Sequence, residues 1–135
     1  MKFSVLTTVY KKETPRNLRK SLLSSYQQTL KPTEIILVCD GELTKELEIE
    51  IQKLQREIPI LKVFHLPENL GSGPASLFGV NQCQTEFIAR MDSDDYSLET
   101  RFEKQLAAFE KNPNLIMVGS NILEKNTEFT ALKKV

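Results

Sequence analysis

The chain has 135 residues, with eighteen basic and eighteen acidic side chains and a formal net charge of zero. This length favours one domain, and the balanced charge excludes a general nucleic-acid binder or a membrane-surface protein. The two cysteines, Cys39 and Cys83, lack CxxC or Cys/His spacing, which argues against a zinc site or a disulfide framework and fits the reducing cytoplasm. No apolar run is long enough for a secretory signal or a membrane span.

Five short segments rich in Val, Ile and Phe are predicted to form strands. Two of them contain the continuously apolar runs IILV and LIMV, which are typical of strands covered on both faces. The five predicted strands are residues 2–9, 33–39, 60–66, 86–91 and 115–122.

Helical periodicity occupies the connections between these strands. Apolar residues recur every three or four positions in the first, second and fourth connections, and a further helix is expected near residues 74–83. Strands and helices that alternate in this way predict an α/β domain with a mainly parallel sheet flanked by helices. The periodic positions are Leu18, Leu22 and Tyr26, then Leu43, Leu47, Ile51, Leu54 and Ile58, and finally Phe102, Leu106 and Phe109.

Polar residues follow each of the first four predicted strands. Parallel sheets bind ligands beyond the carboxyl ends of their strands, where the strand order reverses. These positions are therefore the candidate site. They are Tyr10, Asp40 with Gly41, Asn69 with Gly71, and Asp92 with Asp94 and Asp95.

The three carboxylates of Asp92, Asp94 and Asp95 need an explanation. They could cap the following helix, since Asp favours helix starts, but Ser97 is itself a suitable N-cap. Close carboxylates repel one another by about 4 kcal/mol per pair at an effective dielectric of about 20, so a positive group should balance them. Arg90 and a hard divalent cation are the two candidates.

Other metal-binding and phosphate-binding patterns do not fit the chain. An EF-hand that began at Asp92 would put Tyr96 at its fifth position and Ser97 where glycine is required. The chain also lacks the P-loop pattern GxxxxGK[ST] and the dinucleotide pattern GxGxxG. A cation that bridges a diphosphate is therefore the favoured metal hypothesis.

Four segments in this order, SVLTTVY, EIILVCDG, ENLGSGPASLFGV and RMDSDDYSLETRFEKQ, carry a family resemblance. The third is similar to an N-x-G-x-x-x-A segment, with Asn69, Gly71, Ala75 and Gly79 at matching positions, and the fourth resembles a DxD signature. Together they resemble the inverting family 2 glycosyltransferases with the GT-A fold. That resemblance implies a Rossmann-like nucleotide-diphospho-sugar transferase sheet, of which residues 1–135 would be the truncated N-terminal, nucleotide-sugar-binding part.

The resemblance also implies roles for the acidic residues. Asp94 would coordinate a Mn²⁺ or Mg²⁺ ion that bridges the two phosphates of the donor, and Asp92 would hydrogen-bond the ribose. Asp40 would accept a hydrogen bond from the base. Asp95 would support the metal site or cap the next helix, and Arg90 would contact the diphosphate or neutralise the aspartates.

The remaining donor-binding residues are Thr8, Tyr10, Asn69 and Gly71. Tyr10 would pack on or near the base, with a place in the core as the alternative. Asn69 and Gly71 would shape the loop after the third strand, where glycine permits a left-handed turn, or contact the donor directly.

The implied reaction is metal-dependent transfer of a sugar, with inversion, from a nucleotide-diphosphate donor to the hydroxyl of a saccharide or lipid-linked acceptor. This would serve polysaccharide or cell-envelope glycan synthesis in the cytoplasm, at the inner face of the membrane. The family's general base lies well downstream of the DxD signature, so it is expected beyond Val135. No catalytic residue is assigned, and the isolated chain, without its acceptor-binding half, is expected to be inactive.

Two alternatives from other classes stay open. A sugar nucleotidyltransferase also uses metal-bound aspartates, but it would carry a Gly-rich loop after the first strand, where VYKKETPR has no glycine. A non-catalytic nucleotide-binding or receiver-like module would keep its acidic pair after the first strand.

Overall fold

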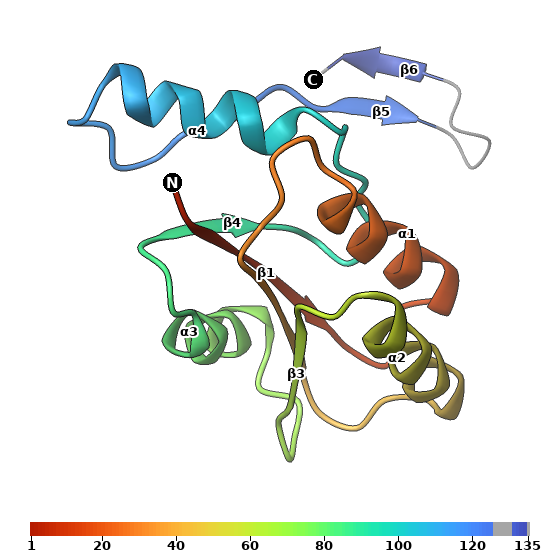
Figure 1. Cartoon of the computed structure of the whole chain (residues 1–135). Coiled ribbons are helices and arrows are strands. Elements are labelled where there is room, and N and C mark those ends of the chain that lie inside the picture. Colours follow the sequence, from red (N-terminus) through yellow and green to blue (C-terminus); the bar gives the residue numbers. More distant parts are fainter. Residues whose placement is uncertain (126–130, 135) are drawn as a thin grey trace. The chain divides into compact units, whose positions relative to one another are not determined.

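The computed structural model describes residues 1–125 and 131–134, in two compact units, Met1–Phe102 and Glu103–Val135. The first unit holds a four-stranded sheet in the order β3-β2-β1-β4, and all three pairings are parallel (Figure 1). Its strands are β1 (Phe3–Val9), β2 (Glu34–Cys39), β3 (Leu61–His65) and β4 (Phe87–Arg90). These bounds confirm the first four predicted strands and the predicted parallel sheet.

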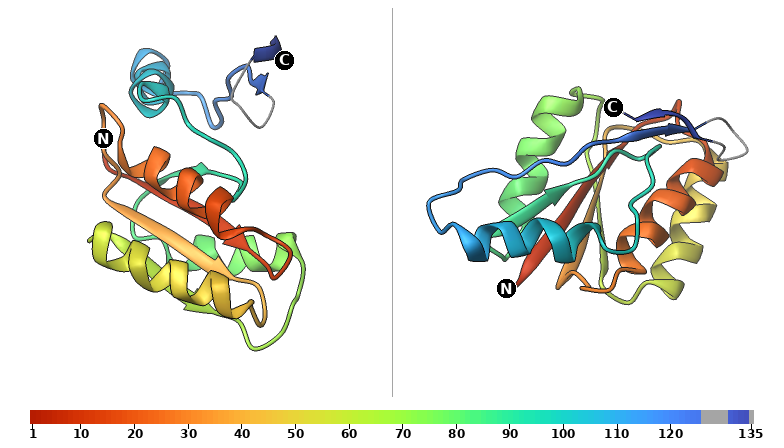
Figure 2. Two further views of the ribbon diagram at one scale, coloured as in Figure 1. Left: turned by 90° about the vertical axis from the view of Figure 1, so that its right-hand side faces the viewer. Right: turned by 90° about the horizontal axis from the view of Figure 1, so that it is seen from above.

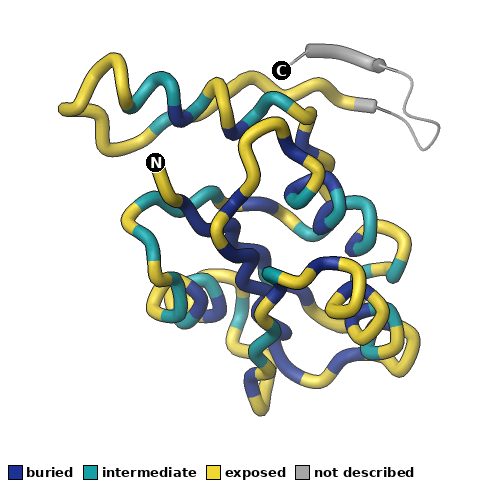
Figure 3. Tube along the Cα trace, in the orientation of Figure 1, coloured by how far each residue is buried: buried dark blue, intermediate teal, exposed yellow. Residues whose placement is uncertain are grey.

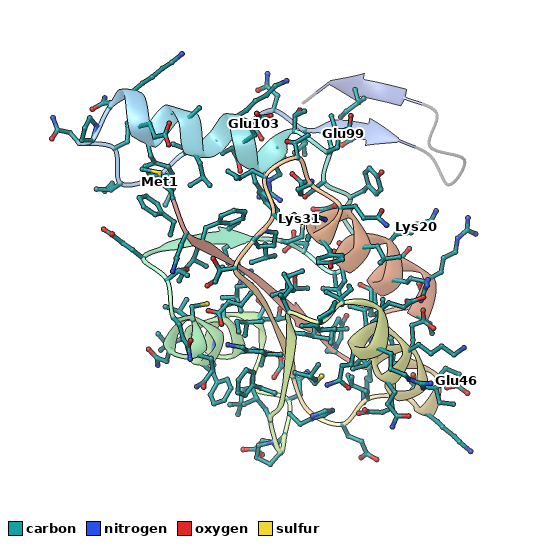
Figure 4. The ribbon with its side chains drawn as sticks, in the orientation of Figure 1. Met1, Lys20, Lys31, Glu46, Glu99 and Glu103 are labelled. Atoms are coloured by element: carbon teal, nitrogen blue, oxygen red, sulfur yellow. The ribbon has the colours of Figure 1, made fainter. Side chains whose placement is uncertain are left out.

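Helices cover both faces of this sheet. Two of them lie on one face and the third on the other, so the strands form the middle layer (Figure 2). Charged side chains such as Lys20 and Glu46 lie on the outer sides of their helices (Figure 4). The two helices of the first face are α1 (Pro15–Tyr26) and α2 (Lys45–Glu57), and the third is α3 (Ser72–Gln82).

Local sequence fixes where α1 and α2 begin. The Thr14 hydroxyl accepts a hydrogen bond from the backbone N–H of Asn17, and Pro15 follows at the first helical position, where its missing N–H costs nothing. Thr44 caps α2 in the same way through the N–H of Leu47. Both helices therefore start where capping and apolar periodicity agree.

The core lies on both faces of β1 and β2, which are almost entirely buried (Figure 3). On the α3 side, Leu6 and Val38 pack against Ala75 and the backbone of Gly79. A Cβ atom added at Gly79 would lie 2.3 Å from Leu6 Cδ1 and 3.0 Å from Val38 Cγ2. Small residues at these helical positions thus let α3 approach the sheet closely.

A buried carboxylate, Glu34, joins three strands at the amino ends. It accepts hydrogen bonds of 2.7 Å from the Ser4 hydroxyl, the Lys62 ammonium and the backbone N–H of Gln84. Burial alone would raise the pKa of Glu34, but these bonds together hold it below its ordinary value. The amino-terminal edge is therefore fixed by a charged contact.

The second unit differs from the prediction. Helix α4 (Arg101–Lys111) is present as expected and runs into this unit. The strand predicted over residues 115–122 is wrong: no regular structure forms there, and β5 (Leu123–Lys125) pairs instead with β6 (Ala131–Lys134) in an antiparallel hairpin. Within residues 1–125 and 131–134 no strand pairs with 115–122, and Ile116 is 97% exposed.

None of the helices in the described ranges has the length and apolar composition that a membrane span requires.

The thiols of Cys39 and Cys83 form no disulfide, and Cys39 is fully buried, which raises its pKa to about 12. The thiol of Cys39 is therefore a small apolar core group, whereas Cys83 is only partly buried.

The close contact of α3 with the sheet predicts the effect of a single methyl group. Gly79→Ala should lower the free energy of unfolding by about 1–3 kcal/mol, because its Cβ would overlap the confined side chain of Leu6. Gly119→Ala, where an added Cβ would meet no atom within 4 Å outside its chain neighbours, is the matched control and should leave stability unchanged or slightly higher. Urea denaturation measures both, and equal stability of the two variants would contradict this packing.

Candidate functional site

The carboxyl ends of the parallel strands meet at one edge of the sheet. The strand order reverses at β1, which lies between β2 and β4. The predicted site residues of the first three strand ends lie together there, around a pocket of about 290 Å³. Its lining residues are Thr8, Val9, Tyr10, Asp40, Asn69, Gly71 and Ser72.

Asp40 organises one wall of this pocket. It is 5% exposed, and its carboxylate accepts hydrogen bonds from the backbone N–H groups of Leu70 at 2.8 Å and Gly71 at 3.1 Å. The Asn69 side chain returns a hydrogen bond of 3.2 Å to the backbone carbonyl of Asp40. Asp40 therefore holds the loop after β3, a structural role that the sequence prediction did not include.

The glycine after Asp40 is required by close approach. Gly41 has a φ of 87°, and a Cβ atom at this position would lie 2.6 Å from the backbone nitrogen of Asn69. Gly71 has a φ of 97° at the start of α3, with only Pro74 near its missing side chain. Gly41 is thus needed for space and backbone conformation, and Gly71 for backbone conformation.

Tyr10 lies at the mouth of the pocket and not in the core. Its side chain is 45% exposed, so the alternative of a buried core aromatic is wrong. An exposed ring beside a pocket offers a flat apolar surface together with a hydroxyl group. This is the surface that a planar ligand could use.

The acidic residues after β4 form a cluster. Asp92, Asp94 and Asp95 are exposed, and one carboxylate oxygen from each lies within 4.8 Å of the others. Burial, followed by the charges of Asp94 and Asp92, raises the pKa of Asp95, while the nearby charge of Arg101 opposes this rise. Repulsion between these carboxylates is therefore present, as the sequence predicts.

Arg101 is the cation that acts on this cluster. Its guanidinium donates hydrogen bonds to the Ser97 hydroxyl at 2.9 Å, to the Arg90 carbonyl at 2.9 Å and to the Met91 sulfur at 3.1 Å. Burial lowers its pKa, and the charges of Asp95 and Asp92 oppose that change. The guanidinium of Arg90 instead donates to the Ser76 hydroxyl on α3.

The capping hypothesis for the cluster does not fit the structure. Helix α4 begins at Arg101, so Asp95 lies in the preceding loop, where its backbone N–H donates to the Asp92 carbonyl. Ser97 is not the N-cap of α4, because its hydroxyl donates to the Met91 sulfur and accepts from Arg101. The carboxylates of the cluster therefore do not cap α4.

Helix α1 holds this loop through side chains that the sequence reasoning missed. The Ser21 hydroxyl donates to the Asp92 carbonyl at 2.8 Å, and the Ser24 hydroxyl accepts from the Ser97 N–H at 3.0 Å. Gln28 donates to the Leu98 carbonyl at 2.8 Å. Ser21 and Ser24 share the buried side of α1 with its leucines, and Gln28 is buried just after the helix. Polar residues on the buried side of an amphipathic helix were the signal that could have revealed the two serines.

A second hollow, of about 470 Å³, lies on α1 and α2 away from the strand ends. Arg19 forms ion pairs there with Glu50 at 3.0 Å and Glu57 at 2.6 Å. His65, the single histidine, faces Glu48 at 3.3 Å and is also outside the pocket. Charges that already pair with one another explain this surface without a ligand.

The pocket lies at the carboxyl edge of a parallel α/β sheet, which is where domains of this class bind their ligands. The family comparison makes this specific: residues 4–133 match the model of glycosyl transferase family 2, and the chain belongs to that family. The family and the α/β fold predicted from the sequence are confirmed.

Curated relatives support this assignment. The chain is 42% identical over 124 residues to an uncharacterized glycosyltransferase of Haemophilus influenzae and 39% identical over 122 residues to the amylovoran biosynthesis glycosyltransferase AmsE of Erwinia amylovora. It is 40% identical over 123 residues to an Escherichia coli UDP-Gal:alpha-D-GlcNAc-diphosphoundecaprenol beta-1,3-galactosyltransferase. These matches cover 90–92% of the chain but only 44–46% of each relative, so the chain spans slightly less than half their length.

Solved structures share the fold. Residues 1–349 of Staphylococcus aureus TarS, in complex with UDP-GlcNAc, match with a TM-score of 0.70 and 27% identity over 84% of this chain and 32% of that one. The complex of the same protein with UDP matches with a TM-score of 0.69 and 26% identity. The parallel sheet with its flanking helices is thus the GT-A fold of a glycosyltransferase.

Removing the side chain of Asp40 should lower the stability of the protein and change the shape of the pocket. Asp40→Ala should lower the free energy of unfolding by about 2 kcal/mol, because the N–H groups of Leu70 and Gly71 lose a charged acceptor. Glu42→Ala, an exposed carboxylate two positions away, is the matched control and should have little effect. Urea denaturation compares the two, and similar losses would refute this role of Asp40.

Proposed function

We propose that this chain is the donor-binding part of an inverting glycosyltransferase, and that its pocket takes a nucleotide-diphospho-sugar. One observation carries the proposal: five predicted donor-binding residues, from three separate strand ends, line the same pocket. Family membership adds the reaction class. It also favours this function over a sugar nucleotidyltransferase or a receiver-like module.

The pocket residues suggest how the nucleotide is held. Tyr10 supplies an exposed ring on which the base packs. Each carboxylate oxygen of Asp40 accepts one hydrogen bond from the loop after β3. Each oxygen has a second lone pair that can accept a hydrogen bond from an N–H of the base. Thr8 lines the floor, and Asn69 and Gly71 set the shape of the wall more than they bind.

The acidic cluster fits a divalent cation. Three carboxylate oxygens within 4.8 Å of one another, all exposed, are the hard ligands that Mg²⁺ and Mn²⁺ prefer, and coordination would relieve their mutual repulsion. Asp94 is proposed as the metal ligand and Asp92 as the partner of the ribose. When bound, the cation would neutralise the charge that develops on the leaving diphosphate. Arg90, the exposed last residue of β4, is proposed to contact the same diphosphate.

The acceptor side of the reaction is proposed to lie outside this chain. Inversion needs a general base beside the acceptor hydroxyl, and we place it beyond Val135, because the curated relatives are about twice as long as the chain. By this proposal the chain binds the donor but does not transfer the sugar by itself.

The names of the relatives suggest the acceptor class. One relative serves amylovoran biosynthesis, and another transfers galactose to a GlcNAc-diphosphoundecaprenol. We therefore propose a saccharide acceptor, lipid-linked, in the synthesis of a cell-envelope polysaccharide at the cytoplasmic face of the membrane.

Calorimetry with UDP-GlcNAc and MnCl₂ tests the donor proposal. Mn²⁺ should strengthen binding to the chain, and Asp94→Ala should remove that gain, a loss of about tenfold or more in affinity. Glu99→Ala, an exposed carboxylate in the same loop, is the charge-matched control and should keep the gain. An affinity for UDP-GlcNAc that does not change with Mn²⁺ would contradict the metal site. Sugar transfer by the chain alone would contradict the proposal that it only binds the donor.

A further inference from the structure

Ser93, between the aspartates Asp92 and Asp94, turns away from them and into the protein. Its neighbours are exposed, whereas Ser93 is half-buried and its hydroxyl donates a hydrogen bond to Oε2 of Glu13. Glu13 is also half-buried, and it lies eighty positions away in the loop between β1 and α1. A single hydrogen bond therefore connects the loop of the acidic cluster to a different loop of the sheet edge.

The loop that carries Glu13 also carries a pocket residue. The backbone N–H of Glu13 donates to the carbonyl of Tyr10 at 3.0 Å, which closes a tight turn after β1. Tyr10 lines the nucleotide pocket. The path from Tyr10 through Glu13 to Ser93 thus joins the proposed base-binding side and the proposed metal-binding side through only two hydrogen bonds.

The two carboxylate oxygens of Glu13 accept hydrogen bonds from different parts of the chain. Oε1 accepts from the Thr14 N–H at 2.9 Å and from the Asn17 side chain at 3.0 Å, and both contacts belong to the start of α1. Oε2 accepts from Ser93. Helix capping therefore explains one oxygen and leaves the other to the acidic loop.

We propose that Ser93 and Glu13 are positioning residues that couple the nucleotide pocket to the metal site. The inference rests on the proposed function, since it needs a nucleotide and a cation at these places. Three like charges repel one another, so their loop needs fixed anchors if the carboxylates are to keep the geometry that a cation requires. The Ser21 hydroxyl anchors the backbone of Asp92 from α1, and Ser93 adds an anchor to the loop of Tyr10.

Coupling between two ligands is measured as a ratio of affinities. If one loop geometry serves both ligands, Mn²⁺ strengthens UDP binding, and UDP strengthens Mn²⁺ binding by the same factor. Without the hydrogen bond between Ser93 and Glu13, each of the two loops changes conformation independently of the other. The ratio then falls, even where the chain stays folded and each ligand alone still binds.

The test uses the full 135-residue chain, with the dissociation constant of UDP measured by calorimetry with and without MnCl₂. Ser93→Ala should lower the ratio of the two constants about fivefold or more, at an unchanged melting temperature. Ser93→Thr should restore the ratio, because it returns the hydroxyl. Glu13→Gln should keep it, because the Ser93 hydroxyl can accept from an amide as well as donate to it.

Asn17→Ala is the matched control, because it removes the side-chain partner of Oε1 and leaves Oε2 with Ser93. It should keep the ratio of the wild-type chain. If Ser93→Ala keeps the ratio of the wild-type chain, the coupling is overturned. It is also overturned if Asn17→Ala lowers the ratio as much as Ser93→Ala does, because the effect would then come from helix capping. An equal loss in Glu13→Gln would assign it to the charge of Glu13 and also overturn the inference. A wild-type chain without any Mn²⁺ effect would overturn the proposed function itself.

Discussion

The parallel pairing of β1 with both β2 and β4 is the constraint on which the rest of this structure depends. Because the pairing of β2 with β3 is parallel as well, all four strands of the first unit end at the same edge. Residues from β1, β2 and the loop after β3 then have to meet around one pocket. The small residues Ala75 and Gly79 of α3 let this helix pack closely against the sheet.

The loops at this edge are held mostly by side chains that bond to backbone atoms. Asp40 fixes the loop after β3, and Ser21 and Ser24 fix the loop after β4. Arg101 closes the latter loop from its far end. Side chains that hold the framework leave Asp92 and Asp94 exposed and free to meet a ligand. The shape of this edge therefore depends on residues that do not line the pocket as well as on those that do.

Sequence reasoning found the strands and their polar ends because both depend on local patterns. Continuous apolar runs mark buried strands, and Asp40 with Gly41 or Asn69 with Gly71 stand out after such runs. The reasoning could not find the partners across the fold. Periodicity in the sequence does not show that the charge of Arg101 acts on Asp92, or that the Ser21 hydroxyl bonds to the Asp92 carbonyl, because both contacts depend on how the chain folds.

The error over residues 115–122 has a related cause. An apolar run predicts a strand only where a neighbouring strand offers hydrogen-bond partners, and within the described ranges none pairs with this segment. The helix predicted near residues 74–83 is present as α3 (Ser72–Gln82), with bounds that differ by two residues at the start and one at the end. A helix satisfies its hydrogen bonds within its own segment, whereas a strand needs a partner strand that its own sequence does not reveal.

The central claim is that nucleotide and metal bind together at the carboxyl edge of the sheet, and amide NMR tests it most directly. On titration with UDP, the account predicts shifts in the resonances of Tyr10, Gly41 and Gly71, and Mn²⁺ should then broaden those around Asp94. Shifts confined to the charged hollow around Arg19 would contradict it.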